Sequence, residues 1–161
     1  LKFSVEPSTS EFPGRDSFGW TFRDSESDSL LSISLEPNPL FPDRLQVVWY
    51  DNADVRTATG YDLFYSGAYD LSVAIVGSGA NASFSATITG MEALPFTGSL
   101  NGAAGATLST FGASIARDPS AAEYGDNYLI FDNVSLTVIP EPASAMLAAM
   151  GLLFAAGRRR R

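Results

Sequence analysis

Short runs of alternating apolar and polar residues, broken by Gly, Pro, Asp and Asn, recur through residues 1–139. A period of two is typical of a half-buried strand, because successive side chains of a strand point to opposite faces. The alternation is clearest at 31–35, 71–75 and 83–89. No part of residues 1–139 shows a long helical periodicity. The chain therefore predicts an all-β fold, a single antiparallel β-sandwich.

Four further strands are expected at 47–50, 55–59, 107–115 and 127–139. Residues 97–105 are small and are expected to form a flexible connection. In the last strand, the alternation of Val134, Leu136 and Val138 would place Asp132 on the core face, where an unpaired carboxylate is costly. We expect either a β-bulge at Asp132-Asn133, which would bury residues 129 and 131 instead, or a hydrogen-bonded structural Asp, rather than a metal ligand.

The charge balance and two absent residue types narrow the classes of function. The chain has 18 acidic and 10 basic residues, and four of the basic residues end the chain, so residues 1–157 hold six basic and 18 acidic side chains, a net charge of −12. Such a surface repels phosphate backbones, which excludes nucleic-acid binding by the body. Without Cys there is no disulfide, thiolate nucleophile or Cys-zinc site, and without His there is no Ser-His-Asp, Cys-His or HExxH chemistry.

The composition changes abruptly after residue 139. Pro140, Glu141 and Pro142 form a rigid, extended spacer. Residues 143–157 carry no charge, and the chain then ends in Arg158, Arg159, Arg160 and Arg161. As a helix, residues 143–157 would span ~22 Å, which crosses a ~30 Å hydrocarbon core only with snorkelling arginines or local thinning. The arginines place the C-terminus in the cytoplasm and the body outside. The alternative is an Ala-rich helix packed on the body, but an all-round apolar helix beside a charge block favours a membrane segment.

These three parts, in this order at the end of the chain, resemble the PEP-CTERM sorting signal of bacterial proteins that an exosortase processes. The resemblance covers residues 140–161 and implies export, with residues 143–157 as a transmembrane helix that anchors the precursor. Pro140, Glu141 and Pro142 would be the recognition motif, with cleavage near them, and Arg158 to Arg161 the stop-transfer cluster. A cell-surface or extracellular destination in an exopolysaccharide-producing, often biofilm-forming, bacterium is also implied.

Such proteins carry an N-terminal signal peptide, whereas this chain begins Leu1-Lys2-Phe3 without Met. We expect that the signal has been trimmed, with truncation of the first strand as the alternative. Residues 125–136 are similar to the closing strand of jelly-roll or concanavalin-A-like sandwiches that often precede this signal. The resemblance implies such a domain over residues 1–139, followed by the sorting signal.

One acidic cluster is a candidate site in the body. Asp24, Glu26 and Asp28 would share one face if their segment were a strand, and glycoside hydrolysis needs two carboxylates ~5–9.5 Å apart. Because serines separate the three acids, we expect a solvated turn ahead of a calcium site or a hydrolase site.

Oxygen ligands for one structural Ca²⁺ are also present. They are Asp126, Asn127 and Asp132, with Asp51, Asp54 and Asn133 as further oxygen donors. No D-x-D-x-D-G spacing accompanies them, and Asp and Asn at strand ends are typical turn formers. No other cofactor is predicted.

Aromatic side chains could bind carbohydrate. Tyr61, Tyr65 and Tyr69, near Gly60 and Gly67, are expected to be exposed and able to stack on sugar rings, whereas Trp49 is expected in the core. The leading hypothesis is an exported, exosortase-processed surface or matrix protein without catalytic activity. The alternative is a carbohydrate-binding module, Ca²⁺-assisted or not, and a glycoside hydrolase ranks last. The expected partners are exosortase, the membrane and extracellular polysaccharide.

Overall fold

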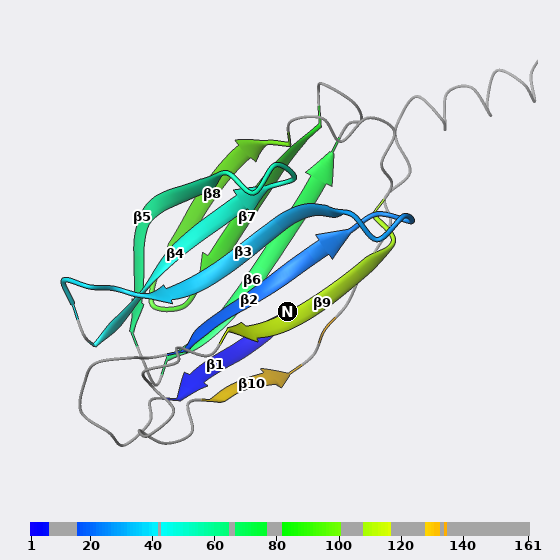
Figure 1. Cartoon of the computed structure of the whole chain (residues 1–161). Helices are drawn as coiled ribbons and strands as arrows, with labels where there is room; N and C mark the ends of the chain where they lie inside the picture. The colour runs from blue at the N-terminus through cyan, green and yellow to red at the C-terminus, as the bar shows by residue number, and fades with distance from the viewer. Residues whose placement is uncertain are drawn as a thin grey trace, which may run out of the picture.

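The computed structural model describes residues 1–6, 16–41, 43–64, 67–76, 82–100, 108–116, 128–132 and 134. Within these ranges the chain forms ten strands in two five-stranded antiparallel sheets, stacked face to face (Figure 1). The predicted all-β fold is therefore confirmed. The even-numbered strands run toward one end of the sandwich, and the odd-numbered strands return.

The first sheet has the order β10-β1-β6-β7-β8 and the second the order β5-β4-β3-β2-β9. The strands of the first sheet are β1 (Lys2–Glu6), β6 (Ala68–Val76), β7 (Ser83–Thr89), β8 (Ala93–Ser99) and β10 (Tyr128–Asp132). Those of the second are β2 (Ser17–Arg23), β3 (Ser29–Pro37), β4 (Arg44–Asp51), β5 (Arg56–Phe64) and β9 (Thr110–Ala116).

The core lies between the sheets and follows the predicted alternation. On β3, Leu31, Ile33 and Leu35 are fully buried, while the serines between them face outward. Aromatic rings from the two sheets are in contact: the ring centroids of Phe3 on β1 and Trp20 on β2 lie 4.8 Å apart. Burial of apolar area at about 25 cal/mol per Å² makes this interior the main source of stability.

One of the strands that sequence analysis missed, β8, lies at the edge of the first sheet. Residues 97–105 were expected to be a flexible connection, but residues 97–99 belong to β8, which pairs with β7 along its whole length. Pro95 and Gly98 are uncommon in strands, so the sequence did not indicate one here. An edge strand tolerates a proline, because the N–H groups on the outer side of such a strand have no ladder partner. Strands β1 and β2 were also not predicted.

Of the strand predicted at 127–139, the structure describes β10, Tyr128–Asp132, and residue 134, which is not in a strand; the remaining positions lie outside the described residues. The register of β10 with β1 is continuous and places Phe131 opposite the buried Phe3, and Asp132 opposite the exposed Lys2. The β-bulge predicted at Asp132-Asn133 is not tested, because residue 133 lies outside the described residues. No helix in the described part of the chain is long and apolar enough to cross a membrane. The predicted helix at 143–157 lies outside the described residues.

Candidate functional site

The candidate acids Asp24, Glu26 and Asp28 lie in the hairpin turn between β2 and β3, not on a strand. One carboxylate oxygen of Asp24, Oδ1, accepts hydrogen bonds from the backbone N–H groups of Glu26 and Asp28, both at 2.9 Å. Ser27 adopts a positive φ of 72°, and its carbonyl accepts a 2.7 Å bond from Arg23 Nη1. The carboxylate of Asp24 thus closes a turn, as the solvated-turn prediction required.

Asp51 closes the β4–β5 turn in the same way. Its Oδ1 accepts from the N–H groups of Ala53 and Val55, both at 2.9 Å, and Asp54 takes the positive φ, 56°. Unlike Asp24, Asp51 is buried, with 4% of its surface exposed. In both turns the acid at the first position bonds the second and fourth following residues, so these two carboxylates stabilise backbone geometry.

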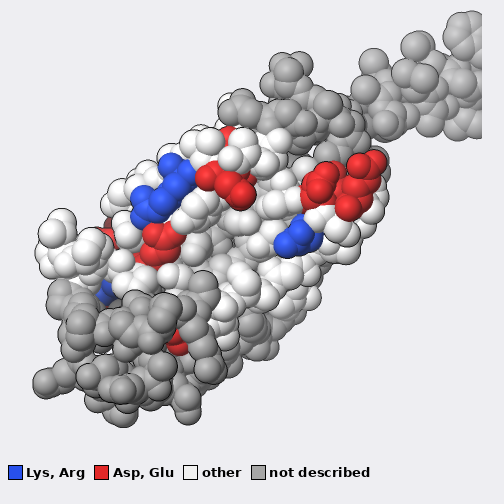
Figure 2. Space-filling model, in the orientation of Figure 1, with Lys and Arg blue, Asp and Glu red and all other residues white. Residues whose placement is uncertain are grey.

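Acidic side chains gather at the end of the sandwich where β2 and β3 connect, while much of the visible face is uncharged (Figure 2). Among the residues that the structure describes, no three carboxylates lie together in a group that could hold a metal ion. Of the predicted calcium ligands, Asp126 and Asn127 lie outside the described residues, and Asp132 closes β10 opposite Lys2. The calcium site remains a prediction.

Tyr61 and Tyr69 were expected to be exposed, but both are half-buried and pack against the core. The Tyr61 hydroxyl donates to the Pro95 carbonyl at 2.9 Å, and the Tyr69 hydroxyl donates to the Phe64 carbonyl at 2.9 Å. Tyr69 also lies 5.5 Å from Phe3 between ring centroids. The two tyrosine hydroxyls thus connect strands of different sheets, while Tyr65 lies outside the described residues.

One polar cluster on the outer face of the second sheet was not predicted. The Glu36 carboxylate on β3 accepts a 2.5 Å bond from the Tyr50 hydroxyl and bonds of 3.1 and 2.8 Å from Arg56 Nε and Nη2. Burial, followed by the bond to Glu36, raises the pKa of Tyr50 above its ordinary value. Because each charged group here has a partner, the cluster joins β3, β4 and β5 rather than offering a reactive group.

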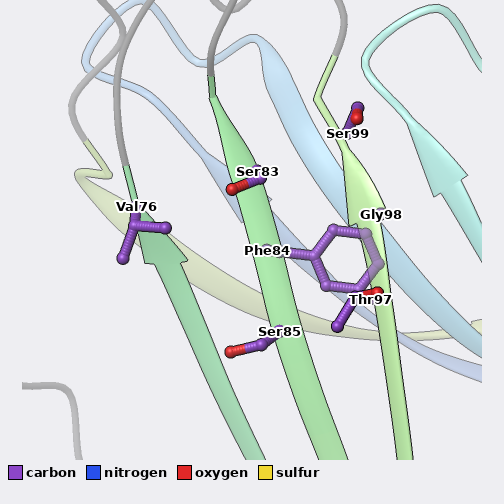
Figure 3. Close-up of a pocket in the computed structure, with 7 residues that line it drawn as sticks. All are labelled: Val76, Ser83, Phe84, Ser85, Thr97, Gly98 and Ser99. Atoms are coloured by element: carbon purple, nitrogen blue, oxygen red, sulfur yellow. The ribbon is translucent and has the colours of Figure 1, made fainter.

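A shallow hollow of about 410 Å³ lies at the end of β6, β7 and β8. Its residues are Val76, Ser83, Phe84, Ser85, Thr97, Gly98 and Ser99. Ser83 and Ser85 point away from the core, whereas the Phe84 ring points inward beside Gly98 (Figure 3). The register places Ser83 opposite Ser99 and Ser85 opposite Thr97, so a block of hydroxyl-bearing residues covers this part of the first sheet.

Sequence analysis predicted one of the two strands that contribute hydroxyl groups to this hydroxyl-lined hollow. The alternation of Ser83 and Ser85 with buried residues marked β7 and its polar face. The facing residues Thr97 and Ser99 were missed, because their segment was expected to be a flexible connection. Only the pairing of β7 with β8 shows that the two polar rows are adjacent.

A family model for the PEP-CTERM protein-sorting motif matches residues 138–161. The chain therefore carries this motif, at almost the range that the sequence predicted. The match indicates an exported protein that is targeted to an exosortase and is membrane-anchored before processing. No curated protein and no solved structure matches the chain, so the jelly-roll or concanavalin-A-like resemblance is not confirmed.

Proposed function

We propose that the β-sandwich is the mature, non-catalytic part of a bacterial surface or matrix protein that exosortase releases from, or re-attaches to, the cell envelope. The observation that carries the proposal is the sorting motif at residues 138–161, which directly follows the sandwich. The use of the candidate groups supports a structural role, because the carboxylates of Asp24 and Asp51 close turns and the tyrosines Tyr61 and Tyr69 join the sheets.

The direction of β10 and the short connection after it bear on where the sorting motif lies relative to the sandwich. Strand β10 runs parallel to β2, β4, β6 and β8, toward the end of the sandwich that carries the β2–β3 and β4–β5 turns (Figure 1). Seven residues separate Asp132 from Pro140, and an extended chain spans at most about 3.3–3.6 Å per residue. The cleavage motif is thereby kept within about 30 Å of the last strand.

Intact-mass spectrometry of the full chain tests the proposal. We expect a product that ends near Pro142 in a host with an exosortase and an uncut chain in a host without one. Glu141→Gln should reduce the cut product in the competent host, whereas Glu26→Gln, in the β2–β3 turn, should not. An uncut wild-type chain in both hosts would contradict the processing step.

A second candidate function is carbohydrate binding at the hydroxyl-lined hollow. Hydroxyl groups at regular spacing on a flat sheet can exchange hydrogen bonds with sugar hydroxyls, as polar groups in ligand sites do. Binding of the full chain to soluble neutral glucans should weaken in Ser85→Val, which removes one hydroxyl from the exposed face of β7. Ser72→Val, on the exposed face of β6 but outside the hollow, is the control. Equal binding by both variants would contradict this function.

A further inference from the structure

Strand β9 forms one edge of the second sheet and, among the described residues, pairs only with β2. Figure 1 shows it running along the rim of the sandwich. In an antiparallel ladder, alternate residues direct both their N–H and C=O groups away from the paired neighbour. The outer side of β9 therefore presents backbone donors and acceptors that another strand can pair with.

Phe111 of β9 packs against the core, with its ring centroid 5.2 Å from that of Phe22, but the rest of the strand reaches solvent on both of its faces. Four consecutive residues, 112–115, are exposed, and Ile115 keeps 55% of its surface accessible. A Cβ atom placed on Gly112 would meet nothing within 4 Å. Ala113 and Ile115 stand opposite Trp20 and Phe18, which are buried, so even the core-facing side of β9 reaches solvent.

Two other edges carry the features that prevent strand addition. Strand β8 contains Pro95, which lacks an N–H and whose carbonyl accepts the Tyr61 hydroxyl. Strand β5 carries the charged residues Arg56 and Asp62, and Gly60 interrupts its extended geometry with a φ of +80°. By contrast, Thr110–Ala116 contains no charge and no proline. Natural edge strands normally need such protection against pairing.

We infer that β9 is a dimerisation edge, at which two copies of this chain pair their β9 strands antiparallel about a two-fold axis at Ala113. This register pairs all seven residues of the strand. Phe111 then faces Ile115 of the other copy, Gly112 faces Ser114, and Ala113 faces itself. The pairs on the core-facing side, Phe111 with Ile115 and Ala113 with itself, are apolar, and no like charges oppose each other, although each chain has a net charge of −8. The second sheets of the two copies become one continuous ten-stranded sheet.

Because the chain has no Cys, single introduced cysteines can report this register. Residues opposite each other in an antiparallel pair have Cβ atoms ~4.5–5.5 Å apart, close to the reach of a disulfide. With copper phenanthroline as oxidant and the full chain in detergent, Ala113→Cys should give at least ~10-fold more linked dimer than Ala58→Cys on the β5 edge. Gly112→Cys and Ser114→Cys should each link poorly alone and link well when mixed.

Equal dimer from Ala113→Cys and Ala58→Cys, or as much from Gly112→Cys alone as from the mixture, would overturn the inference. A charge exchange gives an independent measurement. Ala113→Lys and Ala113→Glu should each be monomeric in sedimentation equilibrium, and their mixture should dimerise again. A monomeric mixture, or dimers of either variant alone, would count against pairing at this axis. The inference concerns the sandwich and holds whether or not exosortase cuts the chain.

Discussion

The hydroxyl of Tyr61 on β5 donates a 2.9 Å hydrogen bond to the carbonyl of Pro95 on β8, which joins the two sheets along one edge of the sandwich. The same bond occupies a backbone acceptor on an edge strand that already lacks one donor. A residue that the sequence marked as a candidate for sugar stacking thus links the two sheets at the edge formed by β5 and β8.

Removal of this bond should weaken the contact between the sheets. Tyr61→Phe keeps the ring against the core and deletes only the hydroxyl, so we expect a loss of about 0.5–1 kcal/mol in the free energy of unfolding, at the low end because the bond is exposed to solvent. Urea titration measures the change. An unfolding midpoint equal to that of the wild type would show that the bond contributes nothing.

The two acidic turns should differ in their sensitivity to substitution. Asp51→Ala removes a buried carboxylate and leaves the N–H groups of Ala53 and Val55, whose two bonds are partly buried, without that acceptor; we expect a loss of about 1–3 kcal/mol. Asp24→Ala breaks the same pair of bonds at an exposed turn, where water replaces them, and should cost less. Thermal and urea unfolding of the two variants should therefore rank them in this order. Asp28→Ala, whose exposed carboxylate closes neither turn, is the control.

Gly98 leaves room for the aromatic contact between the sheets. A Cβ atom at this position would lie 2.5 Å from Phe84 Cε1 and 2.7 Å from Trp49 Cη2, and these two rings pack edge to face at 4.9 Å. We expect Gly98→Ala to destabilise the fold by about 1–3 kcal/mol through overpacking. Gly112→Ala, in open space on β9, should change stability little. Urea titrations that rank the two variants in the opposite order would contradict this account of the packing.

Alkaline pH should reveal the environment of Tyr50. Burial and the bond to Glu36 raise its pKa above the ordinary value of 10.0, so the folded state holds the phenol proton more tightly than the unfolded chain does. This stabilisation is complete below pH 10.0 and is lost as the pH rises through the folded-state pKa. As the pH rises above about 10, the free energy of unfolding should fall less steeply in Tyr50→Phe than in the wild type. Parallel pH profiles would refute the expectation.

The alternation on β3 and β7 predicted strands correctly, because a buried face requires an apolar residue at every second position. The alternation did not predict β8, because Pro95 and Gly98 are typical of strand breaks; a sheet edge accommodates both residues. The acids Asp24 and Asp51 illustrate the same limit at the level of sites. From sequence, Asp24 suits a catalytic pair, a metal or a turn, and Asp51 suits a metal or a turn. The hydrogen bonds that each carboxylate accepts show that both close turns.

The linear order of residues by itself determined the all-β class, the exclusion of thiol and imidazole chemistry, and the sorting motif, because composition, period and a contiguous tail are local properties. Only the tertiary structure decided which strands share an edge, that Tyr61 and Tyr69 face inward, and that Ser83 and Ser85 lie beside Thr97 and Ser99. Those relations depend on pairing between distant segments. Local propensity and residue spacing do not specify these relations, because they arise only when the two sheets pack over a common core.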